Sequence, residues 1–122
     1  MTGPITIIIA DDHPLFRKGL RQTIEAEPSF RILDEATDGE GALRKMIALR
    51  PMIAILDIDM PGRNGLEVAK EAGKLSLPVS IIFLTMYKEE DMFSSAMDLG
   101  IRGYVLKETA GNDILTSIRV VA

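Results

Sequence analysis

The sequence contains no cysteine and no tryptophan, and it has a single histidine. Without cysteine the chain can form no disulfide, no zinc–thiolate site and no cysteine nucleophile. It also lacks any apolar run close to the roughly 20 residues that a membrane-spanning helix needs, and it shows no recognisable signal peptide. We therefore expect a soluble, cytoplasmic protein without membrane contact.

Positive charge is scarce too: 14 lysines and arginines stand against 18 acidic residues, which gives a net charge of −4 over 122 residues. A domain this acidic is not expected to bind nucleic acid by itself. Hydrophobic residues make up 47% of the chain, which is enough for one globular domain with its own core. Because the sequence stops within an expected helix over 113–122, we expect residues 1–122 to be one domain of a longer protein.

Five short apolar runs alternate with five segments of helical periodicity. The runs lie at residues 5–10, 30–33, 53–56, 79–84 and 101–106. The helices are expected to begin at Pro14, at Asp38–Gly39, near Asn64, at Glu89–Asp91, and at a cap formed by Asn112 or Asp113. This alternation predicts parallel strands joined by right-handed crossovers, with the less apolar second strand nearer an edge. The expected fold is α/β, a doubly wound sheet with helices on both faces.

The second expected helix has a clear apolar face. Ala42, Met46 and Leu49 line up along it, with Leu43 and Ile47 beside them. This spacing is typical of a helix that covers a sheet with one side. These residues give the helix one apolar face.

Polar side chains follow four of the apolar runs, at the point where each run ends. They are Asp11 and Asp12, then Asp57, then Thr85, then Lys107. The carboxyl ends of parallel strands lie at one edge of a sheet, which is where ligands bind in this class of fold. A buried charge is costly unless it is paired, metal-bound or used in chemistry. We therefore expect these five side chains to form one site.

The charges of this set indicate its chemistry. Three neighbouring carboxylates raise each other's pKa unless a cation lies among them. A set without cysteine or histidine ligands favours a hard cation, with Mg²⁺ as the first choice. Lys107 and Thr85 can contact phosphate oxygens, and the carboxylate of Asp57 can accept a phosphoryl group. The pattern therefore predicts a phosphoryl-transfer site.

His13 directly follows the acidic pair. It could be a metal ligand or a proton shuttle, or simply a residue of the turn that leads into the first helix. Mg²⁺ does not favour imidazole. We interpret His13 as a residue of the turn.

With these residues in place, the sequence resembles the receiver domain of bacterial two-component response regulators, the CheY-like family. Asp11-Asp12, Asp57 with the following turn at 60–62, Thr85 and Lys107 have the order and spacing of that family, and the resemblance covers essentially the whole chain. The segments 10–14 and 106–108 are more similar to the NarL/FixJ-type branch. The resemblance implies a flavodoxin-like (βα)5 fold with five parallel strands in the order 2-1-3-4-5. It also implies a longer regulator whose C-terminal helix-turn-helix domain, absent from residues 1–122, binds DNA.

The resemblance also implies a role for each residue of the site. Asp57 would accept a phosphoryl group from a sensor histidine kinase, and Thr85 and Lys107 would contact the phosphoryl oxygens. Asp12, Asp57 and the backbone carbonyl of Asp59 would bind Mg²⁺, with Asp11 acting through a water molecule. Tyr104 would be the aromatic switch residue. Phosphorylation would favour a homodimer and control transcription, so the domain would be a signalling module and not an enzyme.

Two departures from the family pattern matter, one directly after the lysine and the other at two positions that follow Asp57 and Thr85. Most receivers have proline after the lysine, often with a cis bond, whereas this chain has Glu108. A cis bond before another residue costs about 3 kcal/mol, so the shape of this loop is open. Asp59 and Tyr87 occupy positions that tune the lifetime of the acyl phosphate across the family. Their effects are expected to oppose each other, because Asp59 adds negative charge whereas Tyr87 would hinder an attacking water.

Two alternative functions stay open. The pair Asp57 and Asp59 after an apolar strand also resembles the nucleophile motif of haloacid-dehalogenase-type phosphatases. That motif is normally on the first strand of its fold, whereas here it is on the third. The other alternative is a receiver-like interaction module that is never phosphorylated. The complete set of acidic residues, Thr85 and Lys107 argues against it.

Overall fold

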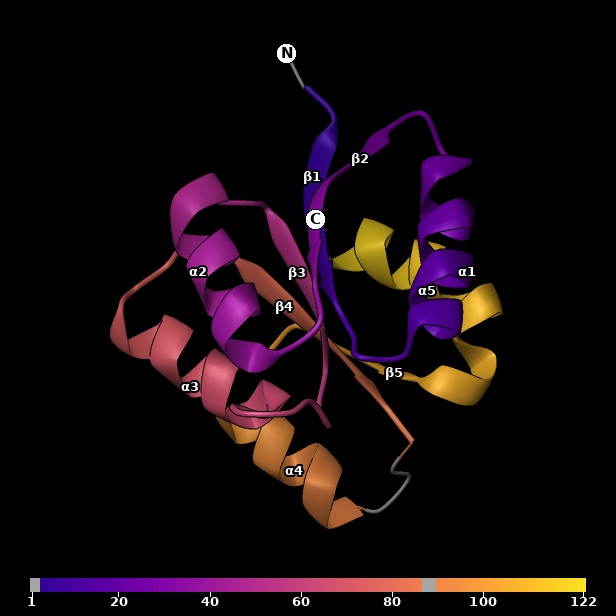
Figure 1. Cartoon of the computed structure of the whole chain (residues 1–122). Helices are drawn as coiled ribbons and strands as arrows, with labels where there is room; N and C mark the ends of the chain where they lie inside the picture. The colour runs from indigo at the N-terminus through magenta and orange to yellow at the C-terminus, as the bar shows by residue number, and fades with distance from the viewer. Residues whose placement is uncertain (1–2, 87–89) are drawn as a thin grey trace.

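A computed structural model of the chain describes residues 3–86 and 90–122 (Figure 1). The roles expected for Tyr87 and for Glu89 concern positions outside these residues. The elements in chain order are β1 (Ile5–Ala10), α1 (Pro14–Glu25), β2 (Phe30–Ala36), α2 (Gly39–Leu49), β3 (Ile53–Asp57), α3 (Gly65–Lys74), β4 (Ser80–Thr85), α4 (Glu90–Asp98), β5 (Gly103–Leu106), the 3₁₀ turn η1 (Lys107–Thr109) and α5 (Ala110–Val121). No helix in these two described ranges is long and apolar enough to cross a membrane.

The five strands form one parallel sheet in the order β2-β1-β3-β4-β5. This confirms the doubly wound α/β fold and the strand order that the resemblance implied. The second strand is at an edge, as its weaker apolar character predicted. The central strand β3 is buried along its whole length, which agrees with its continuous run of apolar side chains.

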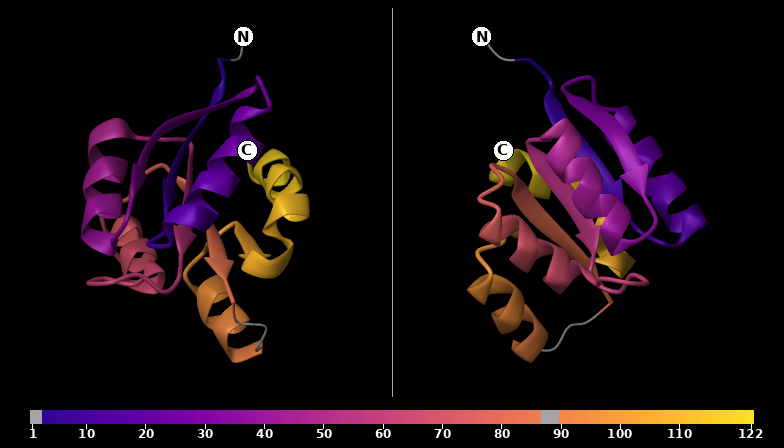
Figure 2. Two further views of the ribbon diagram at one scale, coloured as in Figure 1. Left: turned by 45° about the vertical axis from the view of Figure 1, so that its right-hand side comes forward. Right: turned by 60° about the vertical axis from the view of Figure 1, so that its left-hand side comes forward.

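Helices cover both faces of the sheet, with α1 and α5 on one side and α2, α3 and α4 on the other (Figures 1 and 2). Successive strand residues point to opposite faces. In β1, Ile8 is packed in the core under α2 and α3, whereas Ile7 and Ile9 are packed under α1 and α5. Each buried aliphatic side chain contributes about 1.5–3 kcal/mol to folding. The two apolar cores therefore hold the sheet rigidly beneath its carboxyl edge.

Local signals fix where most helices begin. Pro14 is at the first turn of α1, and the side chain of Asp38 caps α2 by accepting the N–H of Gly41. At α3, Asn64 accepts the N–H of Glu67, while the Glu67 side chain accepts the N–H of Asn64. The helices that begin at 14, 39 and 65 agree with the sequence prediction.

One part of the sequence prediction is wrong. The last helix begins at Ala110 after Thr109, and not at a cap formed by Asn112 or Asp113, because the 3₁₀ turn η1 leads directly into α5. On α2, the apolar face extends beyond the core, because Ile47 and Leu49 are 44% and 41% exposed. The buried face of α2 is centred on residues 42, 43 and 46 instead.

Candidate functional site

Strand register gathers the predicted side chains at one edge of the sheet. Ala10 is paired with Leu56, so Asp11 and Asp57 follow at the same level. Thr85, the last residue of β4, is paired with Leu106, and Lys107 comes next in the chain. Side chains from four strand ends therefore meet at the carboxyl edge, as the sequence predicted.

The acidic side chains form a compact cluster. Asp11 is 0% exposed and Asp57 is 2% exposed, whereas Asp12 is more open to solvent. One ligand atom from each of Asp11, Asp12, His13 and Asp57 lies within 4.8 Å of the others. On the other side of Asp57, its Oδ1 accepts the backbone N–H of Asp59 at 3.1 Å. This hydrogen bond fixes the orientation of the Asp57 carboxylate.

Lys107 supplies the positive charge that the cluster needs. Its Nζ donates to Asp57 Oδ2 at 2.8 Å and lies 3.0 Å from Asp11 Oδ2. The ammonium group also lies over the ring of Phe16, 4.9 Å from the ring centroid. Burial by itself lowers the pKa of Lys107, but its hydrogen bond to Asp57 and its interactions with the carboxylates of Asp11 and Asp57 raise the pKa by more. Lys107 is therefore a permanent cation at neutral pH.

The carboxyl group of Asp57 is in an unfavourable environment for its charge. Burial raises its pKa, and the charge of Asp11 raises it further. The hydrogen bonds from Lys107 and from the backbone of Asp59 lower the pKa, but they do not cancel the rise. A site with an insufficiently neutralised carboxylate gains stability from an additional cation, and the carboxylate is available for a reaction.

Two buried oxygens indicate where a cation would fit. Among the residues that the structure describes, Asp11 Oδ2 and Asp12 Oδ1 accept no hydrogen bond. The Lys107 ammonium is close enough to Asp11 Oδ2 for an ion pair but is not aligned for a hydrogen bond. Carboxylate oxygens without donors are the ligands that Mg²⁺ prefers. The donor set therefore fits the predicted hard cation.

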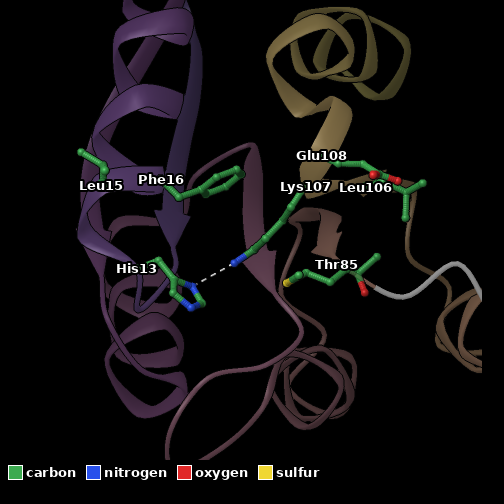
Figure 3. Close-up of a pocket in the computed structure, with 8 residues that line it drawn as sticks. His13, Leu15, Phe16, Thr85, Leu106, Lys107 and Glu108 are labelled. Carbon is green, nitrogen blue, oxygen red and sulfur yellow. Dashed lines mark hydrogen bonds between the residues drawn. The ribbon is translucent and has the colours of Figure 1, made fainter.

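His13 is closer to the acidic cluster than the sequence prediction assumed. It is the N-cap residue of α1, as expected for the turn, but its ring also faces the site (Figure 3). Nδ1 lies 3.1 Å from Asp11 Oδ1, 3.2 Å from Asp12 Oδ1 and 3.1 Å from Lys107 Nζ. The sequence signal for this contact was the position directly after two acidic residues.

Sequence reasoning did not identify Arg17 as part of the site. Its Nη1 donates to the backbone carbonyl of Asp11 at 2.7 Å, and its Nε donates to Glu35 at 2.7 Å. Arg17 lies one turn into α1 and therefore connects the acidic loop to β2. We classify it as a positioning residue, because it contacts the backbone of Asp11 and not the carboxylates.

Three further predicted residues lie on β4, β5 and the 3₁₀ turn η1. Thr85 is 1% exposed at the end of β4. Tyr104, in β5 beside Phe83 of β4, makes an edge-to-face contact with Phe93 of α4, with 5.2 Å between ring centroids. Glu108 is in the 3₁₀ turn η1, and none of the peptide bonds in the described parts of the chain is cis. The loop after Lys107 is therefore a tight trans turn.

A cavity of about 620 Å³ opens beside Lys107. Its walls come from the start of α1 and from the ends of β4 and β5, and Lys107 extends between His13 and Thr85 (Figure 3). Leu15 and Met86, at its rim, are 84% and 74% exposed. The Lys107 side chain therefore forms part of the wall of this cavity.

The chain is similar in sequence to proteins of a known family. The response regulator receiver domain family matches residues 7–119 of the chain. The nitrate/nitrite response regulator protein NarL of Escherichia coli K12 is 34% identical over 119 residues, which are 98% of this chain and 55% of that protein. The transcriptional regulatory protein DegU of Brevibacillus brevis is 31% identical over 118 residues, 97% of this chain and 50% of that protein. The chain spans about half the length of these curated relatives.

Solved structures agree with the sequence relatives. The structure of a DNA-binding response regulator of the LuxR family from Staphylococcus aureus matches with a TM-score of 0.90 at 33% identity, over 96% of this chain and 98% of that one. Receiver domains are signalling domains that interact with histidine kinases and in general bind Mg²⁺. The fold, the strand order and these relatives confirm the resemblance seen in the sequence. The chain belongs to the response regulator receiver domain family, in its NarL/LuxR branch.

Proposed function

We propose that Asp57 accepts a phosphoryl group from the phosphohistidine of a sensor histidine kinase. The observation that carries this proposal is the environment of Asp57: a nearly buried carboxylate whose Oδ2 is 2.8 Å from a lysine ammonium and whose pKa is raised by burial. In the reaction an oxygen of Asp57 forms a bond to phosphorus while the phosphorus–nitrogen bond of the donor breaks. The products are an acyl phosphate and the free histidine of the kinase.

The residues around Asp57 have separate tasks in this proposal. The Asp59 N–H holds one carboxylate oxygen, which leaves the other directed toward Lys107. Lys107 stabilises the charge that the phosphoryl oxygens carry, and Thr85 donates a hydrogen bond to one of them. Asp12, Asp57 and the backbone carbonyl of Asp59 would bind Mg²⁺, with Asp11 acting through water. The ion would neutralise charge on the phosphoryl oxygens.

The acyl phosphate would then act as a switch. Lys107 and Thr85 turn to the phosphoryl oxygens, and Tyr104 takes the space that the Thr85 hydroxyl leaves. The contact between Tyr104 and Phe93 connects β5 to α4, so this movement would change the surface formed by α4, β5 and α5. We propose that this surface forms a homodimer after phosphorylation. The change requires only that the phosphoryl group interacts differently with the two arrangements.

We also propose that residues 1–122 are the N-terminal receiver of a transcription regulator with a C-terminal helix-turn-helix domain. Two observations support this. The chain spans about half of its curated relatives, and one solved relative is described as a DNA-binding response regulator. The net charge of −4 on these residues agrees with DNA binding through another domain.

The test is the intact mass of the protein after incubation with Mg²⁺ and acetyl phosphate. We expect one added phosphoryl group on the wild type, and none without Mg²⁺ or in Asp57→Asn. Asp98→Asn, which changes an exposed carboxylate on α4, is the matched control and should be phosphorylated like the wild type. Catalytic consumption of the donor without an adduct would support the phosphatase alternative. Neither adduct nor consumption would leave the unphosphorylated interaction module.

A further inference from the structure

The cavity beside Lys107 begins next to the carboxylate that the proposed function uses. Two residues of its wall, His13 and Lys107, also lie beside Asp57: Lys107 Nζ is 2.8 Å from Asp57 Oδ2, and His13 Nδ1 is 3.8 Å from the same oxygen. The other oxygen of Asp57 accepts the N–H of Asp59. The inner end of the cavity is therefore formed by groups that surround the oxygen left for a reaction.

The outer wall of the same cavity is apolar. Leu15 and Phe16 come from the first turn of α1, Met86 directly follows β4, and Leu106 is the last residue of β5. Leu15 and Met86 are 84% and 74% exposed, although both are large apolar side chains. Cavities of this size, about 620 Å³, with apolar walls and a few polar groups are typical of small-molecule sites. The wall therefore offers surface that an apolar ligand would remove from water.

The charged groups of the cavity favour an anion at its inner end. Lys107 is cationic at neutral pH, and its side chain extends toward His13 (Figure 3). The proposed function places Mg²⁺ on the carboxylates, which leaves the charge of Lys107 for phosphoryl oxygens. Glu108, which also lines the cavity, is exposed and points away from the ammonium group (Figure 3). A ligand that matches both ends of the cavity has an anionic head and an apolar body.

We propose that acyl phosphates act as direct phosphoryl donors to Asp57, and that the cavity selects those with a longer apolar acyl chain. The phosphoryl group contacts Lys107, and the chain lies along the apolar wall. An oxygen of Asp57 forms a bond to phosphorus while the bond between phosphorus and the acyl oxygen breaks. The carboxylate of the donor leaves with that electron pair. The inference rests on the proposed function, because both use Asp57 as the acceptor.

The shape of the cavity agrees with in-line transfer. The acyl group of the donor must be on the side of phosphorus opposite to Asp57, because the attacking and leaving oxygens are roughly in line. From Lys107, whose side chain is 11% exposed, the cavity extends to the exposed rim at Leu15 and Met86. A chain attached to the phosphoryl group therefore points out of the acidic cluster and along the apolar wall.

The expected preference follows from the length of the chain. Each fully buried methylene group strengthens binding about fourfold. Hexanoyl phosphate has four more methylene groups than acetyl phosphate. Because the cavity is open at its rim, the chain is only partly buried, and we expect the half-saturating donor concentration to fall about tenfold. The maximal rate should change little, since the wall contacts the chain equally in the ground state and the transition state.

The first test measures the rate of phosphorylation with acetyl, butanoyl and hexanoyl phosphate in the presence of Mg²⁺, followed by intact mass. The leaving carboxylates of this series have nearly the same basicity, so the intrinsic reactivity of the donors is matched. We expect the half-saturating concentration to fall with each longer chain. A concentration that does not depend on chain length, or a preference for acetyl phosphate, would overturn the proposal and leave the cavity to a side chain of the kinase.

The second test places the preference in the cavity. The double variant Leu15→Ala and Met86→Ala removes apolar surface at the rim, and substitutions at such exposed positions change stability little. We expect the preference for hexanoyl over acetyl phosphate to fall at least about threefold. Val120→Ala is the matched control, because Val120 is 77% exposed on α5 and is not among the residues that line the cavity. An unchanged preference in the double variant, or an equal loss in the control, would overturn the proposal.

Binding without transfer separates this inference from the proposed function. In 2-oxoheptylphosphonate a methylene group replaces the bridging oxygen of hexanoyl phosphate, so the phosphoryl group cannot be transferred. Calorimetric titration should show that it binds about tenfold more tightly than 2-oxopropylphosphonate, the matching analogue of acetyl phosphate. This result in a protein that no donor phosphorylates would support the cavity as a binding site while contradicting the proposed function. Phosphorylation of Asp57 by all donors at one half-saturating concentration would contradict the inference alone.

Discussion

The substitution Asp57→Asn should stabilise the metal-free protein, although it removes a side chain that makes a hydrogen bond to Lys107. Burial and the charge of Asp11 raise the pKa of Asp57 despite that hydrogen bond. A raised pKa means that the folded state disfavours the charged form of the side chain. An asparagine of the same shape removes the charge and still accepts the N–H of Asp59. Lys107 keeps its ion pair with Asp11 at 3.0 Å.

The size of this stabilisation follows from the charge interactions that Asp57 loses, calculated at an effective dielectric constant of about 20. Asp57 lies within 4.8 Å of Asp11, which gives a repulsion of at least about 3.5 kcal/mol. Removing a charge from water costs several kcal/mol more. The attraction to Lys107 at 2.8 Å offsets about 6 kcal/mol of this sum. We expect a net gain of about 1–2 kcal/mol in the free energy of unfolding, or about 4–8 °C in Tm.

Urea unfolding of the two proteins, followed by circular dichroism with and without Mg²⁺, tests this expectation. The stability that a carboxyl group with a raised folded-state pKa contributes is complete below its unfolded pKa and is lost as the pH rises through its folded pKa. The advantage of Asp57→Asn should therefore grow from acid to neutral pH. Mg²⁺ at 100 times its Kd should stabilise the wild type by about 2.7 kcal/mol and the variant far less. A less stable metal-free variant, or equal stabilisation of both proteins by Mg²⁺, would refute the reasoning.

Two further substitutions test the supports of the site. Gly65→Ala should destabilise the protein by about 1–3 kcal/mol in urea unfolding, because its Cβ would lie 2.6 Å from the Asp57 carbonyl oxygen; Gly73→Ala in the same helix has open space and should be neutral or stabilising. Similar effects of both would contradict this explanation. Glu35→Gln should cost about 1 kcal/mol at pH 7, because hydrogen bonds from two α1 arginines outweigh burial and lower the pKa of Glu35. That stability is present above the unfolded pKa and is lost as the pH falls through the folded pKa, so a pH-independent cost in thermal unfolding would contradict it.

The sequence predicts much of this site because strand ends are readable in a parallel sheet. Each continuous apolar run ends at a polar residue, and parallel strands with short connections must place these ends at one edge. The positions of Asp11, Asp57, Thr85 and Lys107 follow from this rule alone. Helix starts were predictable where a specific cap exists, as at Asn64, whose side chain and that of Glu67 cap each other. In these cases the information is local.

The sequence predicts less where contacts between distant segments decide the local structure. The start of α5 depends on the turn that carries Lys107 to the acidic cluster, and this turn continues into the helix before any capping residue is reached. Leu49, in the last turn of α2, is 41% exposed although it continues the apolar repeat of Ala42 and Met46, so the repeat alone does not decide burial. The orientation of the His13 ring depends on groups up to 94 residues away, because Lys107 is one of its partners.

The surroundings of His13 and Asp57 are set by segments that are distant in the sequence, and this affects what each side chain can bind. His13 is an ordinary N-cap residue as far as α1 is concerned, since its backbone conformation is extended and its ring is 59% exposed. Its ring lies among charged groups only because two strands and a 3₁₀ turn bring three carboxylates and an ammonium group within 4 Å of one nitrogen. Asp57 shows the same dependence, because burial by both sheet neighbours raises its pKa and makes it sensitive to cations. The sheet therefore sets which residues meet, and the charge balance at its edge decides what each of them can bind.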